Sequence, residues 1–217
     1  MPEKAPPVYP PAQESDAPFA GFPVVFVGSF PDATRTLEPG LPEIAFLGRS
    51  NVGKSSLLNA LFGRRLAKVS TTPGRTAHIN VYRLPSLYLL DLPGYGFARV
   101  SHGERRRYAR LVRGLVEKRK SLAGVLWLLD IRHDPGAEDR AYGELLAASG
   151  VPVLVALTKG DKLPFGQRRK RLQEFPALLA LPEEQVQLTS STTGEGIADL
   201  GASLLGATLP HREEERS

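Results

Sequence analysis

The chain has 217 residues, enough for one domain of ordinary size, and 41% of them are apolar, enough for a substantial core. It contains no cysteine, which excludes disulfides and thiolate metal sites. No apolar run approaches the length of a membrane span, and the first residues lack the pattern of a secretory signal, so we expect a cytoplasmic protein without a membrane partner. Lys and Arg number 28 against 23 Asp and Glu; this basic excess permits nucleic acid as a partner without establishing it.

Three parts of the chain differ in composition. Residues 1–22 are rich in proline and are expected to form a disordered tail, and residues 208–217 form a charged C-terminal tail. Between them, residues 23–207 alternate between strand-like and helical patterns, which predicts an α/β domain with a mostly parallel central sheet flanked by helices. The predicted strands are 24–27, 43–47, 79–84, 87–90, 125–129, 153–157 and 186–188, and the predicted helices are 54–61, 104–120, 137–148, 166–179 and 197–205. Such sheets bind ligands at the carboxyl ends of their strands.

The first motif, GRSNVGKS at 48–55, fits G-x-x-x-x-G-K-[ST] and lies between a predicted strand and a predicted helix, as a phosphate loop requires. Its glycines let backbone N–H groups turn toward a phosphate chain, and the helix N-terminus adds partial positive charge. We expect Lys54 to reach the β- and γ-phosphates and Ser55 to bind Mg²⁺. The alternative is a chance glycine-rich turn, and the loop alone does not separate a GTPase from an ATPase or a small-molecule kinase. The predicted phosphate-binding residues are Gly48, Arg49, Ser50, Asn51, Val52, Gly53, Lys54, Ser55 and Ser56.

The second motif, Asp91-Leu92-Pro93-Gly94, follows the apolar run 87–90. A strand-end Asp can hold Mg²⁺ directly or through water, and Gly94 can bring its N–H against a γ-phosphate because it has no Cβ. Such segments are also common in ordinary turns. Their position downstream of a phosphate loop favours the nucleotide reading.

Between these motifs lies a polar segment, 70–76, which we interpret as a switch loop ordered by the γ-phosphate; an ordinary threonine-rich loop is the alternative. Arg75 could supply charge to the reaction, although a phosphate contact or simple exposure is favoured. His78 could touch the edge of the nucleotide. The predicted nucleotide-binding residues of this segment are Gly74, Arg75, Thr76, Ala77 and His78.

The third motif, Thr158-Lys159-Gly160-Asp161, ends the predicted strand 153–157. The carboxylate of Asp161 can accept hydrogen bonds from N1–H and the 2-amino group of guanine, which adenine does not offer, and a site built this way rejects analogues that lack those donors. The stem of Lys159 can lie over the base. After the next strand, Thr189, Ser190 and Ser191 are expected to close over the base; as a motif they are weak, because Ser/Thr clusters are usually loops.

Taken together, GRSNVGKSS, PGRT, DLPGYGFA, LLDIRHDP and LTKGDKL resemble the EngB family of GTPases over roughly residues 24–207. The resemblance implies a monomeric P-loop G domain that uses GTP, GDP and Mg²⁺, with Thr76 joining Ser55 and Asp91 in the metal shell. It also implies a role in maturing the large ribosomal subunit and a link to septum formation in dividing bacteria.

The catalytic assignment is limited to Lys54 and Asn51. Tyr95 follows DLPG where many GTPases carry a water-positioning Gln, so we expect slow intrinsic hydrolysis that needs an activator. By resemblance to GTPases with Asn at this loop position, Asn51 holds K⁺ beside the phosphates or merely stabilises the loop, and the sequence favours neither.

Two basic runs are candidate contacts for ribosomal RNA, although charge runs are usually solvated helix faces. A non-catalytic RNA-binding factor therefore stays open beside the kinase and ATPase readings, both of which leave TKGDK unexplained. The runs consist of Arg105, Arg106, Arg107, Arg110, Arg113, Lys118, Arg119 and Lys120, and of Arg168, Arg169, Lys170 and Arg171.

Overall fold

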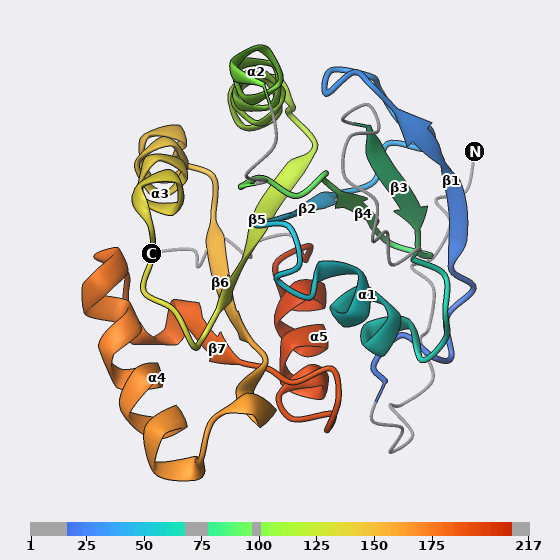
Figure 1. The fold of residues 1–217 in the computed structure, drawn as a ribbon. Coiled ribbons are helices and arrows are strands. Elements are labelled where there is room, and N and C mark those ends of the chain that lie inside the picture. Colours follow the sequence, from blue (N-terminus) through green and yellow to red (C-terminus); the bar gives the residue numbers. More distant parts are fainter. Residues whose placement is uncertain (1–16, 68–77, 97–100, 210–217) are drawn as a thin grey trace, which may run out of the picture.

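The computed structural model describes residues 17–67, 78–96 and 101–209 (Figure 1). Within them, seven strands form one sheet in the order β1-β3-β4-β2-β5-β6-β7, and β3 runs antiparallel to its neighbours while β4, β2, β5, β6 and β7 are parallel. The strands are β1 (Val25–Phe30), β2 (Glu43–Gly48), β3 (Ile79–Arg83), β4 (Tyr88–Asp91), β5 (Leu122–Asp130), β6 (Val153–Thr158) and β7 (Val186–Leu188).

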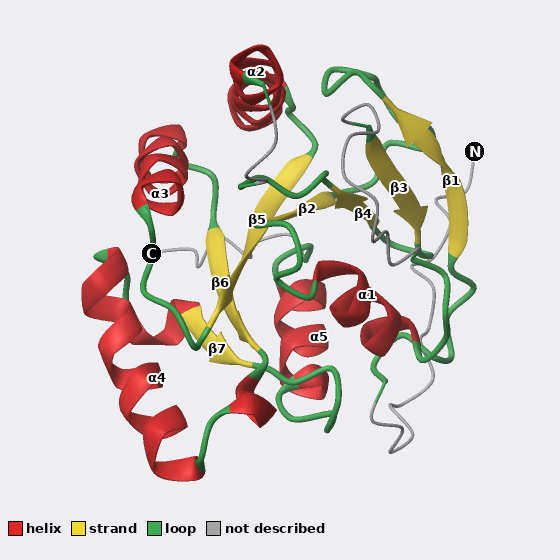
Figure 2. Cartoon of the chain, viewed as in Figure 1, coloured by secondary structure: helices red, strands yellow, loops and turns green. Residues whose placement is uncertain are grey.

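Helices cover both faces of the sheet (Figure 2). One apolar cluster joins α2, α3 and α4 to one face, and a second joins α1 and α5 to the other. The helices are α1 (Lys54–Phe62), α2 (His102–Lys118), α3 (Ala137–Ser149), α4 (Phe165–Leu179) and α5 (Ile197–Gly206), with short 3-10 turns at Gly160–Lys162 and Glu183–Gln185.

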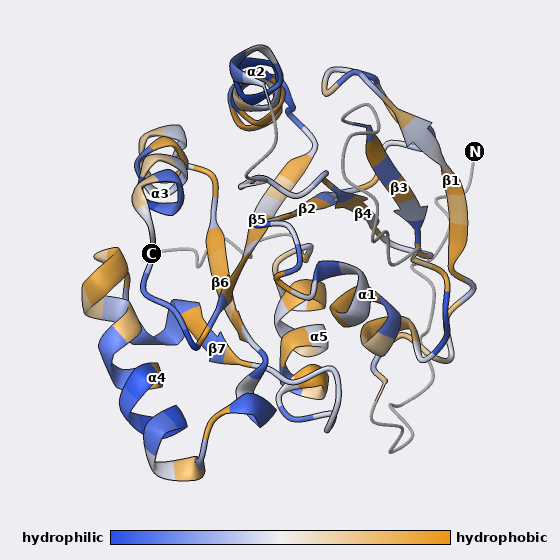
Figure 3. Ribbon diagram, viewed as in Figure 1, coloured by the Kyte–Doolittle hydropathy of each residue, from blue (hydrophilic) through white to orange (hydrophobic). Residues whose placement is uncertain are grey.

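The central strands are apolar on both sides because helices cover both faces of the sheet. Along β5, Trp127 and Leu129 pack into the cluster under α2 and α3, whereas Leu126 and Leu128 pack into the cluster under α1 and α5. Figure 3 shows the resulting apolar character of β5 and β6. The parallel register brings the carboxyl ends of β4, β2, β5 and β6 to one edge, where the predicted motifs begin.

The predicted strands and helices are confirmed, with shifts of a few residues at their ends. One end has a physical cause. Helix α2 stops at Lys118, before the predicted 120, because Arg119 turns inward and forms a buried ion pair with Glu43. The Arg119 guanidinium also donates to the carbonyl of Ala33 at 2.6 Å. Its assignment to an exposed basic surface is therefore wrong.

The segment before β1 also differs from its expectation. Phe19 is fully buried, its N–H donates to the Leu61 carbonyl at 2.9 Å, and its ring joins the cluster under α1 and α5. The prediction of a tail over 1–22 is therefore wrong for residues 17–22, because Phe19 and Phe22 pack together on this cluster and dock the segment. Residues 1–16 and 210–217 lie outside the described residues. In the part of the chain that the structure describes, no helix has the length and apolar content needed to span a membrane.

Candidate nucleotide-binding site

The phosphate loop connects β2 to α1 through backbone conformations that few residues adopt. Gly53, which precedes the first residue of α1, has φ 107°, and Asn51 lies in the left-handed region at φ 63°. Asparagine tolerates that region better than most residues. The hydroxyl of Ser50 is buried and lacks a hydrogen-bond partner among the described residues. An unpaired polar atom inside a loop of this shape is suited to a polar ligand.

Lys54 and Asp91 meet at the start of α1. The Lys54 ammonium forms an ion pair with the Asp91 carboxylate, and both side chains are largely buried. Asn80 on β3 donates to the second oxygen of Asp91 at 3.2 Å. The register of β3, β4 and β2 therefore places one cation and one carboxylate beside the helix N-terminus. These are the groups that a phosphate chain and a hard metal ion require.

The DLPG segment lies directly on the phosphate loop. The N–H of Ser50 donates to the carbonyl of Tyr95 at 2.7 Å, and the N–H of Tyr95 donates to the carbonyl of Gly48 at 3.2 Å. A Cβ on Gly94 would lie 2.8 Å from the backbone N and Cα of Ser50, so no larger residue fits there. Gly94 is thus required by this close approach, whatever else it contacts.

The side chain of Tyr95 points into the protein. Its hydroxyl donates to Asp139 at 2.8 Å and accepts from the indole N–H of Trp127 at 3.0 Å, and its ring packs against Tyr108 and Tyr142. Burial, and secondarily the Asp139 charge, raises the pKa of Tyr95, so the hydroxyl stays protonated. Because this hydroxyl is committed to internal partners, it is unavailable to orient a water molecule.

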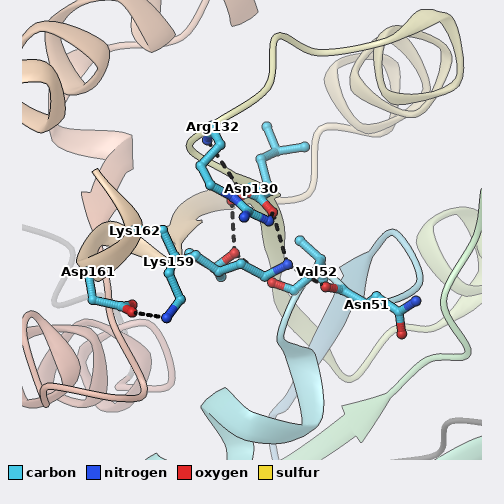
Figure 4. A network of polar contacts seen from close by, with 9 residues as sticks. Asn51, Val52, Asp130, Arg132, Lys159, Asp161 and Lys162 are labelled. Carbon is cyan, nitrogen blue, oxygen red and sulfur yellow. Dashed lines mark hydrogen bonds and ion pairs between the residues drawn. The ribbon is translucent and has the colours of Figure 1, made fainter. Parts of the chain in front are cut away.

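The TKGD segment is tied to the phosphate loop by two hydrogen bonds (Figure 4). The hydroxyl of Thr158 donates to the Val52 carbonyl at 2.7 Å, and the Lys159 ammonium donates to the Asn51 carbonyl at 2.7 Å. Lys159 itself has φ 63°, which turns its side chain back toward the loop. The TKGD segment and the phosphate loop are therefore directly connected.

Asp161 meets the Thr-Ser-Ser segment that follows β7. The hydroxyl of Ser190 donates to Asp161 at 2.8 Å, and the N–H of Gly160 donates to the carbonyl of Thr189 at 3.1 Å. Burial opposes ionisation, but hydrogen bonds from Lys162 and Ser190 outweigh it and lower the pKa of Asp161. Asp161 is therefore an anion at neutral pH, as acceptance from two guanine donors requires.

The structure thus brings together most of the predicted residues of the phosphate loop, the DLPG segment, the TKGD segment and, in part, the Thr-Ser-Ser segment. Thr189 and Ser190 are buried beside Asp161, whereas Ser191 is exposed. His78 lies just before β3. Gly74, Arg75, Thr76 and Ala77 lie outside the described residues.

Comparison with known proteins places these features in a family. A family model described as a 50S ribosome-binding GTPase matches residues 43–159. A relative from Gemmatimonas aurantiaca, named probable GTP-binding protein EngB, is 47% identical over 167 residues, which cover 76% of this chain and 82% of the relative.

The chain belongs to the EngB family of GTP-binding proteins. It is therefore a GTPase that binds guanine nucleotides, with the P-loop GTPase fold predicted from its sequence. A crystal structure of a probable GTP-binding protein EngB superposes with a TM-score of 0.66 at 22% identity, covering 76% of this chain and 98% of that one. A structure of Era with MgGDPNP and nucleotides 1506–1542 of 16S ribosomal RNA superposes with a TM-score of 0.61 at 23% identity, covering 80% of this chain and 58% of that one.

Two acidic residues of this EngB domain were assigned no role from the sequence. Asp139, in the first turn of α3, accepts from Tyr95 and Arg49, and Asp130, at the end of β5, contacts Lys159. The position of Asp130 at a strand end was a usable signal, because the other motifs begin at strand ends. Asp139 had only the weaker signal of an acidic residue in the first turn of a predicted helix.

Proposed function

We propose that this chain is a guanine-nucleotide switch that hydrolyses GTP slowly with Mg²⁺ and acts in assembly of the large ribosomal subunit. The observation that carries the switch is the direct contact of the DLPG segment with the phosphate loop. Gly94 packs on Ser50 beside the buried pair of Lys54 and Asp91. A γ-phosphate bound here would contact both segments. Its loss on hydrolysis would remove a contact from the DLPG backbone and allow that segment to change conformation.

The oxygen donors at this site fit Mg²⁺. Asp91 supplies a buried carboxylate, Ser55 a hydroxyl in the first turn of α1, and Thr76 is the proposed third protein ligand. When bound, the ion would neutralise charge on the phosphate oxygens. Lys54 would leave Asp91 to contact the β- and γ-phosphates.

A K⁺ ion held by Asn51 remains a proposal. The Asn51 carbonyl already accepts from Lys159, and its left-handed backbone suits a loop-shaping role. Its side chain is exposed and so free to turn toward an ion. Equal hydrolysis rates in K⁺ and Na⁺ would remove this proposal.

Slow hydrolysis follows from the position of Tyr95. At the place where many GTPases carry Gln, its hydroxyl is bound to Asp139 and Trp127. Described residues therefore offer no replacement for Gln at that position, and we propose that the ribosome completes the site. Residues outside the described ranges, Arg75 and Thr76 among them, are further candidates.

The proposed ribosomal contact is the exposed face of α2. Arg105, Arg106 and Arg107 are exposed and form no ion pair with any described residue, while Arg113 pairs with Glu117. The second basic run, on α4, is less available. There Arg168 pairs with Glu195 and Arg171 with Asp134 and Glu174. The family description and the Era–RNA structure support an RNA partner in the same class of protein. A role in septum formation is proposed on the family resemblance alone.

Sedimentation with ribosomal subunits tests this function. The protein is expected to co-sediment with the large subunit in GTP or a non-hydrolysable analogue and to dissociate from it in GDP. It is not expected to bind the small subunit. Binding that is independent of nucleotide, or specific for the small subunit, would contradict the proposal. Depletion in the host should cause accumulation of immature large subunits before septa fail; septum defects with a normal subunit profile would separate the two roles.

A further inference from the structure

The ammonium of Lys159 is held from two sides (Figure 4). It donates to the Asn51 carbonyl of the phosphate loop at 2.7 Å and lies 2.9 Å from a carboxylate oxygen of Asp130. The Lys159 side chain is thereby stretched from the end of β6, across the end of β5, to the phosphate loop. A lysine stem has much rotamer freedom, so two fixed acceptors are needed to hold it in one conformation.

Asp130 is itself held rigidly. Its carboxylate accepts from the backbone N–H of Arg132 at 3.1 Å and from the Arg132 guanidinium at 2.9 and 2.7 Å. The register of β5 and β6 sets Asp130 opposite Thr158, the residue before the lysine. Asp130 is therefore aimed at Lys159 by both its own loop and the sheet.

The charge of Asp130 persists at neutral pH. Partial burial opposes ionisation, but hydrogen bonds from Arg132 and Lys159 outweigh it and lower the pKa of Asp130. A charged acceptor makes stronger hydrogen bonds than a neutral one. The ammonium thus has one strong partner in Asp130 and one neutral partner in the Asn51 carbonyl.

Asp130 and Lys159 lie at a hollow beside the phosphate loop. Asp130, Asn51 and Lys159 line one hollow of about 390 Å³ that also reaches Ser50 and Val52 of the phosphate loop. Asp161, the proposed reader of the guanine edge, instead pairs with Lys162 and Ser190. Holding the lysine and reading the base edge are therefore done by different carboxylates.

We propose that Asp130 is a positioning residue for guanine-nucleotide binding, acting by holding Lys159 against the phosphate loop. The inference rests on the proposed role of Lys159 at the base. Because Asp130 contacts no group proposed to read the base edge, its loss weakens binding without changing the choice of base. Asp161 alone sets that choice.

The test compares Asp130→Asn, which keeps the shape but removes the charge, with Asp134→Asn as matched control. Asp134 lines the same hollow, but its partner is Arg171 on α4. Dissociation constants and dissociation rates of fluorescent GDP and inosine diphosphate are measured for each. Asp130→Asn should weaken both nucleotides by about 10-fold, a typical effect for one member of a coupled charged pair, and Asp134→Asn should change them less than about twofold. Asp130→Glu, which restores the charge, should recover part of the affinity.

A double-mutant cycle with Lys159→Met separates positioning from general damage to the loop. If Asp130 acts through Lys159, adding Asp130→Asn to Lys159→Met should accelerate GDP release less than about twofold further. Losses that simply add, a native dissociation constant for Asp130→Asn, or an equal loss in Asp134→Asn would each overturn the inference. A shifted ratio of GDP to inosine diphosphate affinity would also overturn it. If the native chain itself failed to bind GDP, that result would contradict the proposed nucleotide site as well as the role of Asp130.

Discussion

Asp139 is the residue at which three parts of the molecule meet. Its buried carboxylate accepts from the Tyr95 hydroxyl at 2.8 Å, from the Arg49 guanidinium at 3.1 Å and from the Gly136 N–H at 2.8 Å. Through these bonds, the residue after DLPG, a phosphate-loop residue and the start of α3 share one acceptor. Trp127, the only tryptophan of the chain, donates to the same Tyr95 hydroxyl, so its fluorescence should report on this network.

The first prediction concerns Tyr95→Phe. Asp139 and Trp127 each lose a buried partner, so at pH 7 unfolding should cost about 1–3 kcal/mol less than in the native chain. The hydrolysis rate should stay unchanged, because the hydroxyl faces inward. Urea unfolding followed by Trp127 fluorescence, together with phosphate release, measures both. A large drop in hydrolysis with native stability would show that the hydroxyl acts in the reaction.

The same variant has a pH dependence of known sign. The pKa of Tyr95 is raised in the folded state, so its stabilising contribution is complete below the ordinary tyrosine pKa of about 10 and falls as pH rises above it. The stability difference between the native chain and Tyr95→Phe should therefore narrow between about pH 10 and 11. A difference that is constant over that range would contradict the burial argument.

Helix α2 has a buried apolar face that packs on the protein and an exposed basic face. Tyr108, Val112 and Leu115 are buried in the cluster with α3 and β5, and a capping box of Ser101 and Glu104 starts the helix. The arginines occupy the exposed side. Because burial anchors the helix, its exposed charges contribute little to folding and can serve a partner.

A double variant of α2, Arg106→Glu combined with Arg107→Glu, reverses two of these charges. Binding to the large subunit should fall by at least about 10-fold. Its salt dependence should become shallower, because the variant makes fewer phosphate contacts and its binding releases fewer counterions. Both positions are exposed, and Glu favours a helix about as well as Arg does, so the helix should persist. The matched control reverses Arg169 and Lys170, which are exposed on α4; it makes the same change of charge outside the proposed contact and should bind nearly as the native chain does. Equal effects in both variants would indicate non-specific attraction.

On the scale of the whole molecule, two apolar clusters on opposite faces of one sheet hold the strand ends in register. The cluster under α1 and α5 is completed by residues from outside the regular elements, above all Phe19. Since α1 begins at Lys54, packing beneath it supports the phosphate loop as well as the fold.

The corresponding prediction is for Phe19→Ala. Removing this fully buried ring should lower the free energy of unfolding by about 3–5 kcal/mol, because a cavity opens beneath α1 and α5. Phe26→Ala on the edge strand β1 is the control; that side chain is 52% exposed, and its loss should cost about 1 kcal/mol or less. Urea unfolding of both variants makes the comparison. Similar losses would show that the segment before β1 does not belong to the core.

Much of the protein follows from the sequence by itself. The alternation of apolar strands and amphipathic helices predicts the α/β fold, because periodicity reflects which side of each element is buried. The phosphate loop and the TKGD segment could also be predicted, because each is a short contiguous segment that requires particular residue types at fixed spacing.

Other features were decided only by the tertiary structure. Lys159 and Asn51 are 108 residues apart, and Tyr95 and Asp139 are 44 apart, yet each pair is joined by a hydrogen bond. Arg119 lies within a run of basic residues, but it forms an ion pair with Glu43 of β2 and is therefore buried. The chemistry of a side chain determines which groups it can bond to. The partner that it contacts depends on how the strands and helices pack.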